Sequence, residues 1–347
     1  MMAKKNLLIT AVVLVAVAYG FQYFKNNNSG KQDPFVGKPI LQSGIVESID
    51  KITLNTPTTG VTLQKNDGKW EVSDADNYPV NMEKLIKLIE NLSVSRIASL
   101  VTADPDKMAD FNVLLPQDAN DKKEHIGSLI TLVQGDKILF QLVIGKNRTA
   151  VSQNASQPQG AGGSDGTYIR LGEKKAVYLI KDNLTLDTDS KKWLNTVLFR
   201  IEKDTIQTID FKVGKDAFQF TRAEKKDELT LSDIPTGETI ESNPVSGLLN
   251  DLSEFEIKDI VLTRDMGEKH LKLVSQARIK LFSGDGPSFE VFETGDTEKQ
   301  YFIQFLPDTK SFSAELIKLN DKWTFEMEGW RIKKWLKAKA EYYQKKK

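Results

Sequence analysis

The spacing of hydrophobic positions changes along the chain, beginning with an unbroken apolar run near the N-terminus. Residues 7–24 read LLITAVVLVAVAYGFQYF, 18 residues without a charged side chain, and Lys4 and Lys5 precede them. A run of this length nearly suffices for a helix to cross a hydrocarbon core, and the two lysines favour a cytoplasmic N-terminus. The pattern predicts a transmembrane anchor, with the bulk of the chain on the extracytoplasmic side.

Two alternatives compete with the anchor. Ala16-Val17-Ala18 resembles the cleavage site of a secretory signal peptide, and a buried helix of a soluble core is the second alternative. The run stays apolar and aromatic as far as Phe24, which favours an uncleaved anchor. The polar residues 26–44, with Asn, Gly and Pro, are expected to form a linker and argue against a core helix.

Beyond the linker, one order of strand-like and helical segments occurs twice. Alternating apolar positions predict three strands in each copy: 49–54, 61–63 and 70–72, then 206–211, 217–220 and 229–231. A helix follows in each copy, the first after the N-cap Asn81 and the second around 244–252. Later strands are expected in matching places: 94–101, 129–133, 138–143, 168–171 and 177–180, then 277–282, 289–292, 301–305 and 312–316.

These patterns predict an α+β protein in which an N-terminal transmembrane helix precedes two similar, mostly antiparallel α+β lobes. The expected domains are 1–25 (cytoplasmic tip and transmembrane anchor), 26–44 (linker), 45–202 (first lobe) and 203–347 (second lobe with a basic C-terminal helix). Each lobe closes with an apolar segment that contains tryptophan, at 193–199 and 330–336.

Composition removes several classes of function. The 48 basic and 48 acidic residues balance, so no overall field attracts nucleic acid. Cysteine is absent, which excludes disulfides, thiolate metal sites and a cysteine nucleophile. The two histidines, His125 and His270, stand in charged, loop-like surroundings. We therefore expect no metal, no cofactor and no catalytic residue.

The C-terminal segment is the one strong local charge asymmetry. Between residues 330 and 339, basic side chains surround an apolar side, so the segment suits contact with an anionic membrane surface or an acidic partner. The candidate contact residues are Trp330, Arg331, Lys333, Lys334, Trp335, Lys337 and Lys339. The alternative is a terminal helix packed on the second lobe through Trp330, Ile332 and Trp335.

Three stretches resemble a bacterial family called domain of unknown function 4340. They are Trp70–Val72 leading into 78–81, the turn from 103–105 to 111–113, and Leu142–Lys146 followed by 168–170 and 177–180. One departure is Asn112, where the family usually has glycine; asparagine tolerates the left-handed conformation. The resemblance implies an N-terminal anchor and an association with gliding-motility-type ABC transporters, and it implies no catalytic residues.

The leading hypothesis is a non-enzymatic accessory subunit of an ABC-transporter-type complex in a bacterial inner membrane. Its partners would be a polytopic permease or another subunit of the complex, and membrane lipid through the N-terminal helix. The alternative is an extracytoplasmic module that binds a glycan, lipid or peptide between the lobes. A less favoured alternative is an envelope hydrolase that uses two carboxylates.

Overall fold

The computed structural model describes residues 33–118, 123–149, 164–267, 270–295 and 298–345. The chain divides into two compact units, Met1–Asn195 and Thr196–Lys347. The sequence placed the boundary between lobes at 202/203, because the apolar segment 193–199 was assigned to the first copy. Strand β10 (Val197–Phe199) instead pairs with β15 (Phe255–Glu256) within the second unit.

The fold class predicted from the sequence is wrong. It included a transmembrane helix, whereas no helix among the described residues is long and apolar enough to cross a membrane. The longest of them, α2 (Met82–Val94), has 13 residues, about 20 Å of helix against a hydrocarbon core of about 30 Å. The prediction rested on 7–24, which lies outside the described residues. What the structure does show is mostly antiparallel β-sheet.

The N-terminal unit is built on one nine-stranded sheet, in the order β4-β3-β2-β1-β6-β7-β8-β9-β5. Neighbouring strands in it pair antiparallel. The strands are β1 (Lys51–Asn55), β2 (Gly60–Asn66), β3 (Lys69–Val72), β4 (Tyr78–Pro79), β5 (Ile97–Thr102), β6 (Ser128–Gln134), β7 (Lys137–Thr149), β8 (Ser164–Leu171) and β9 (Val177–Ile180).

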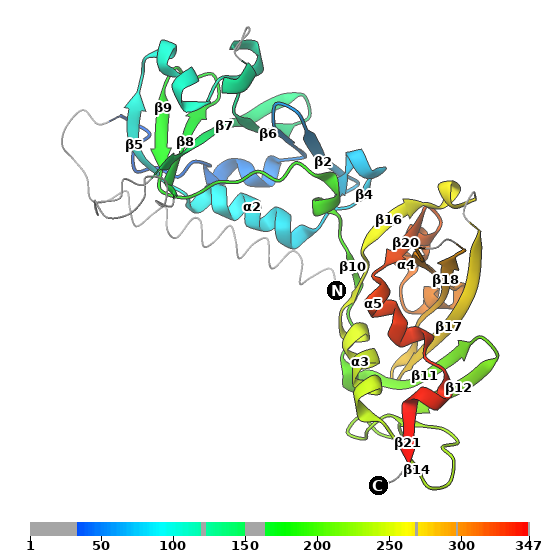
Figure 1. The fold of residues 1–347 in the computed structure, drawn as a ribbon. Coiled ribbons are helices and arrows are strands. Elements are labelled where there is room, and N and C mark those ends of the chain that lie inside the picture. Colours follow the sequence, from blue (N-terminus) through cyan, green and yellow to red (C-terminus); the bar gives the residue numbers. More distant parts are fainter. Residues whose placement is uncertain (1–32, 119–122, 150–163, 268–269, 296–297, 346–347) are drawn as a thin grey trace. The chain divides into compact units, whose positions relative to one another are not determined.

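Helix α2 runs along one side of this sheet (Figure 1). It begins where the Oδ1 of Asn81 accepts a hydrogen bond from the backbone N–H of Lys84 at 3.0 Å, so the N-cap expected from the sequence is confirmed. Leu85, Ile89 and Leu92 are buried at helical spacing, and this stripe attaches the helix to the core.

The C-terminal unit contains an eight-stranded antiparallel sheet, in the order β13-β12-β11-β17-β18-β19-β20-β16. Its strands are β11 (Ile206–Val213), β12 (Asp216–Thr221), β13 (Thr230–Leu231), β16 (Asp259–Leu262), β17 (Leu271–Leu281), β18 (Gly284–Thr294), β19 (Tyr301–Phe305) and β20 (Trp323–Met327). When the edge strand β4 is left out, the first sheet has the same strand order as the second. Its strands β3, β2, β1, β6, β7, β8, β9 and β5 correspond in turn to β13, β12, β11, β17, β18, β19, β20 and β16. Helix α3 (Ser242–Ser253) occupies the place in the chain that α2 has in the first unit.

Two segments of the C-terminal unit differ from the sequence prediction. The expected strand at 312–316 is the start of helix α4 (Ala314–Asn320), which the side chain of Ser313 caps by accepting from the N–H of Leu316. The matching strand is β20, whose five residues are all buried. A strand buried on both faces shows no alternation of apolar and polar residues, so the sequence pattern did not predict β20.

The expected basic C-terminal helix is four short elements. They are α5 (Gly329–Ile332), the 3-10 turns η11 (Lys333–Leu336) and η12 (Lys339–Tyr342), and β21 (Tyr343–Lys345). Strand β21 pairs with β14 (Glu238–Ile240), and α3 lies beside η11. The segment 329–345 is thereby attached to the rest of the C-terminal unit at two places, beside α3 and along β14.

Candidate functional site

Trp335 anchors the C-terminal segment in the core of its unit. Its side chain is 0% exposed, and its ring centroid lies 5.5 Å from that of Phe211 and 5.2 Å from that of Phe289. Its indole Nε1–H donates to Asp251 on α3 at 3.2 Å. A buried, hydrogen-bonded tryptophan of this kind contributes to packing, and Trp335 has no surface to offer a partner.

Two of the predicted basic contact residues are held by acidic partners. The Nζ of Lys334 lies 2.7 Å from Asp251. Arg331 donates to the carbonyl of Glu254 at 3.0 Å and lies 3.3 Å from the carboxylate of Glu256. Both cations therefore fix the segment to α3 and β15.

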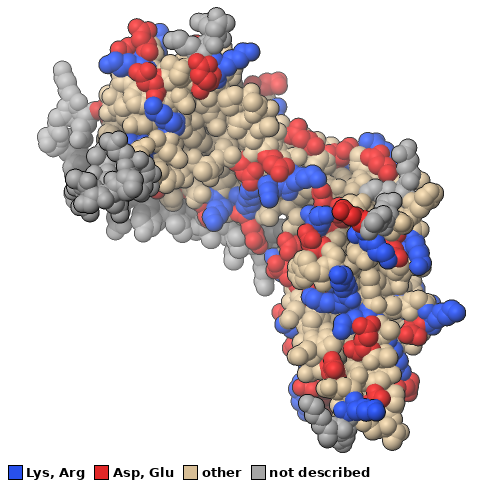
Figure 2. Space-filling view, viewed as in Figure 1, with Lys and Arg blue, Asp and Glu red and all other residues tan. Residues whose placement is uncertain are grey.

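Trp330 is the exposed member of the group, with 61% of its surface accessible. The cationic groups of Arg331 and Lys334 stand 5.3 and 5.2 Å from its ring centroid, on cation–π contacts. Lys333, three residues after Trp330, is also exposed. Figure 2 shows Lys and Arg side chains gathered over the α5 region. We call Trp330, Arg331, Lys333 and Lys334 the Trp330 patch.

The remaining two predicted residues lie further along the segment. Lys337 is half-buried, with its Nζ 6.0 Å from the ring centroid of Tyr342. Lys339 is also half-buried and borders a hollow on the sheet. Of the seven residues that the sequence proposed, the structure thus brings four together and buries Trp335, while Lys337 lies beside Tyr342 and Lys339 borders the hollow.

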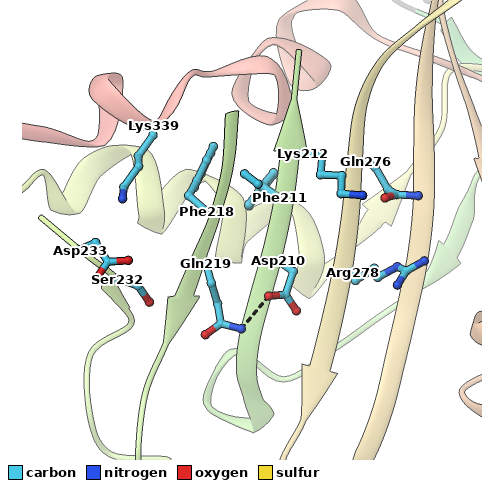
Figure 3. Close-up of a pocket in the computed structure, with 11 residues that line it drawn as sticks. Asp210, Phe211, Lys212, Phe218, Gln219, Ser232, Asp233, Gln276, Arg278 and Lys339 are labelled. Carbon is cyan, nitrogen blue, oxygen red and sulfur yellow. Dashed lines mark hydrogen bonds between the residues drawn. The ribbon is translucent and has the colours of Figure 1, made fainter. Parts of the chain in front are cut away.

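The hollow, called here the sheet hollow, has a volume of about 600 Å³ and lies on strands β12, β11 and β17 (Figure 3). It is open to solvent, and polar side chains line most of it. The lining residues are Asp210, Phe211, Lys212, Ala217, Phe218, Gln219, Ser232, Asp233, Gln276, Arg278 and Lys339. The rings of Phe211 and Phe218 are themselves buried and stack at 5.3 Å.

The strand register arranges the polar side chains in two rows. Gln219, Asp210 and Arg278 are opposite one another on β12, β11 and β17. Two residues along, Lys212 stands opposite Gln276, so the second row lies about 7 Å from the first. Because side chains two apart in a strand share a face, both rows present their polar groups to the same side.

Interactions within the hollow leave several polar groups with spare capacity. Asp210 accepts one hydrogen bond, from Gln219 at 2.6 Å. The Nε of Arg278 lies 3.7 Å from Asp308, with both side chains about half exposed. Within the described residues, Lys212 and Lys339 show no ion pair. The sequence did not single out this site, although the i, i+2 pairs Asp210/Lys212 and Gln276/Arg278 are its visible signal.

The surroundings of Ser164 and His125 do not form a catalytic arrangement in the described residues. Ser164 lies in the string Gly162-Gly163-Ser164-Asp165-Gly166, which matches a nucleophile elbow. That motif requires a strand-to-helix turn, whereas Ser164 begins strand β8 and donates to Asn183 at 2.6 Å. His125 lies 3.3 Å from both Asn112 and Glu124. The described residues contain no cluster of three or more metal-ligating side chains.

The described residues define a protein of two mostly antiparallel β units with the same strand order, a patch around one exposed tryptophan and a polar hollow. Residues 70–274 match the family model described as Domain of unknown function (DUF4340). The match covers more than half of the chain, so the chain belongs to this family. No curated protein and no solved structure matches the chain. The Trp330 patch lies outside the matched residues.

Proposed function

We propose that the protein is a non-enzymatic accessory subunit of a bacterial inner-membrane complex of the ABC-transporter type. In this proposal the Trp330 patch binds a polytopic permease or another subunit of that complex. The observation that carries it is the contrast between Trp330, 61% exposed, and its neighbour Trp335, fully buried. Trp335 fixes the C-terminal segment in the core, and Trp330 stands exposed on that segment.

The surroundings of Trp330 suit a protein contact. Tryptophan and arginine are among the residues enriched at the positions that dominate binding energy in protein interfaces. The cations of Arg331 and Lys334 are already ordered by Glu256 and Asp251. Ordering before binding reduces the entropy that the complex has to give up.

The proposed location is the inner membrane, with the described residues on the extracytoplasmic side. Two sequence features support it. Lys4 and Lys5 precede an uncharged run at 7–24, and such a charge distribution favours retention of the N-terminus in the cytoplasm. The balance of 48 basic and 48 acidic residues gives no competing preference for nucleic acid.

Gentle detergent extraction from the native host tests the proposal. Full-length protein should co-purify with a polytopic membrane protein, and Trp330→Ala should reduce recovery of that partner by about tenfold or more, the range expected for an interface hot spot. Leu273→Ala is the matched control, since Leu273 is an exposed hydrophobic of the same unit, 50% accessible, outside the patch. A lone monomer, or equal recovery with Trp330→Ala, contradicts the proposal.

A further inference from the structure

We propose that the sheet hollow binds an acidic carbohydrate, a sugar unit that carries hydroxyl groups together with a carboxylate. This goes beyond the accessory role, since no residue of the Trp330 patch lines the hollow. Basic and acidic side chains both face the hollow, and each kind requires a different group on the ligand.

The basic groups require an acid. Lys212, Arg278 and Lys339 come from β11, β17 and the C-terminal segment, so they approach the hollow from separate elements (Figure 3). Arg278 retains further N–H donors beside the Nε that faces Asp308 at 3.7 Å. Lys212 and Arg278 lie on neighbouring strands two register positions apart, so these two cations can hold one anionic group by charge-assisted hydrogen bonds.

The acidic groups require hydrogen-bond donors. Asp210 lies at the centre of the first row, between Gln219 and Arg278. With one hydrogen bond received from Gln219, its carboxylate can still accept others. Asp233 adds a second carboxylate to the lining. A pure polyanion would be repelled by these groups, whereas sugar hydroxyls donate to them; the mixed lining therefore selects a ligand with both hydroxyls and an acid.

The position of the hollow argues against a peptide. Extended peptides bind at strand edges, where backbone N–H and C=O groups are free. At the centre of the hollow, β11 and β17 are each paired on both sides, so their backbone groups are used in the sheet. Strand β12 pairs with β13 only at Phe220 and Thr221, and tetraglutamate tests the part of its edge beyond them as a peptide site. A ligand on this face is recognised by side chains, and Gln219, Gln276 and Ser232 offer the amide and hydroxyl groups that suit a sugar.

Titration calorimetry of the full-length protein in detergent tests the proposal with three probes. They are a galacturonic acid tetrasaccharide, the neutral galactose tetrasaccharide and tetraglutamate. The acidic sugar should bind, and the other two should bind at least about tenfold more weakly, because each lacks one of the two required kinds of group. Absence of binding by the acidic sugar, or equal binding of tetraglutamate, overturns the proposal.

Two variants assign the binding to the hollow. Lys212→Gln should weaken binding of the acidic sugar about tenfold, the loss expected for one charged hydrogen bond. Lys215→Gln should leave it unchanged, since Lys215 is an exposed lysine of the β11–β12 turn that does not line the hollow. Equal losses in both variants would indicate a nonspecific charge effect and overturn the assignment.

Asp210→Asn separates sugar recognition from simple anion attraction. The amide keeps the shape of the side chain and the hydrogen bond from Gln219, but it accepts hydroxyls more weakly. Sugar recognition predicts weaker binding of the galacturonic acid tetrasaccharide. Mere attraction of an anion predicts tighter binding, because a repelling charge has been removed, and that result overturns the proposal. An unchanged circular dichroism spectrum shows that the variant is folded.

Discussion

Gly145 lies directly against the carbonyl oxygen of Phe111. A Cβ placed on Gly145 would stand 2.2 Å from that oxygen and 2.6 Å from a methyl group of Val113. Gly145 belongs to strand β7, whereas Phe111 ends the 3-10 turn η4 (Ala109–Phe111). Two of the stretches that resemble the family are therefore in contact, and the glycine allows the turn to pack on the strand.

Gly145→Ala should destabilise the N-terminal unit. The added methyl group meets backbone, which cannot move aside cheaply, and overpacking of this kind costs about 1–3 kcal/mol. Urea denaturation followed by fluorescence measures the change. Gly44→Ala is the control, because no atom lies within 4 Å of a Cβ at Gly44, and it should have little effect. Equal midpoints for the two variants would contradict the close packing.

Local backbone conformations and capping hydrogen bonds were the features that the sequence predicted best. Asn112 was expected to take a left-handed conformation, and its φ of 55° confirms this. Asp104 stands directly before Pro105, and its side chain caps the turn by accepting from the N–H of Asp106 at 3.1 Å. Such features depend on residues one to three apart, so the sequence contains the whole interaction.

The candidate site could be predicted less well from the sequence, because it depends on residues far apart in the chain. Nothing local distinguishes Trp330 from Trp335; the difference arises because Asp251 and Phe289 receive the second ring. The sheet hollow is similar, since Asp210 and Arg278 are 68 positions apart and meet only through the register of β11 with β17. Alternation predicts which residues share a face of one strand, and it leaves the neighbouring strand undetermined.

Substitution of the two tryptophans should separate their roles. Trp335→Ala removes a fully buried ring and should cost about 3–5 kcal/mol of unfolding free energy. Trp330→Ala removes a ring that is 61% exposed and should change stability by less than about 1 kcal/mol. Thermal unfolding of the full-length protein compares the two. Similar losses in both variants would show that Trp330 is a packing residue after all.

Alkaline pH should destabilise the fold through Tyr178. Burial, and then the charge and the 3.3 Å hydrogen bond of Asp33, raise the pKa of Tyr178 to about 12, whereas an unfolded tyrosine ionises near about 10. The stabilising contribution is therefore complete below about pH 10 and is lost as pH rises through about 12. Tyr178→Phe should show a shallower loss of stability across this window. An identical pH profile for the variant and the wild type would refute the assignment.

The contact of Asp251 with Lys334 should be a principal attachment of the C-terminal segment. Asp251 is 4% exposed and receives both the Nζ of Lys334 at 2.7 Å and the indole N–H of Trp335 at 3.2 Å. Asp251→Ala leaves both donors without their acceptor and should cost about 1–3 kcal/mol. Glu254→Ala removes a side chain paired with Arg200 at a site where both are more than half exposed, and should cost less than about 1 kcal/mol.

Limited trypsin digestion gives a second readout of the same attachment, because Lys333, Lys334 and Lys337 are cleavage sites within the segment. Cleavage there requires local opening, and its rate follows the population of the opened state when reclosing is fast. Asp251→Ala should therefore accelerate cleavage in the segment by about tenfold, the factor that corresponds to about 1.4 kcal/mol. Glu254→Ala should be cleaved at the wild-type rate. If Asp251→Ala lowers the stability of the whole unit without faster cleavage in the segment, Asp251 stabilises α3 and the attachment lies elsewhere, in the pairing of β21 with β14.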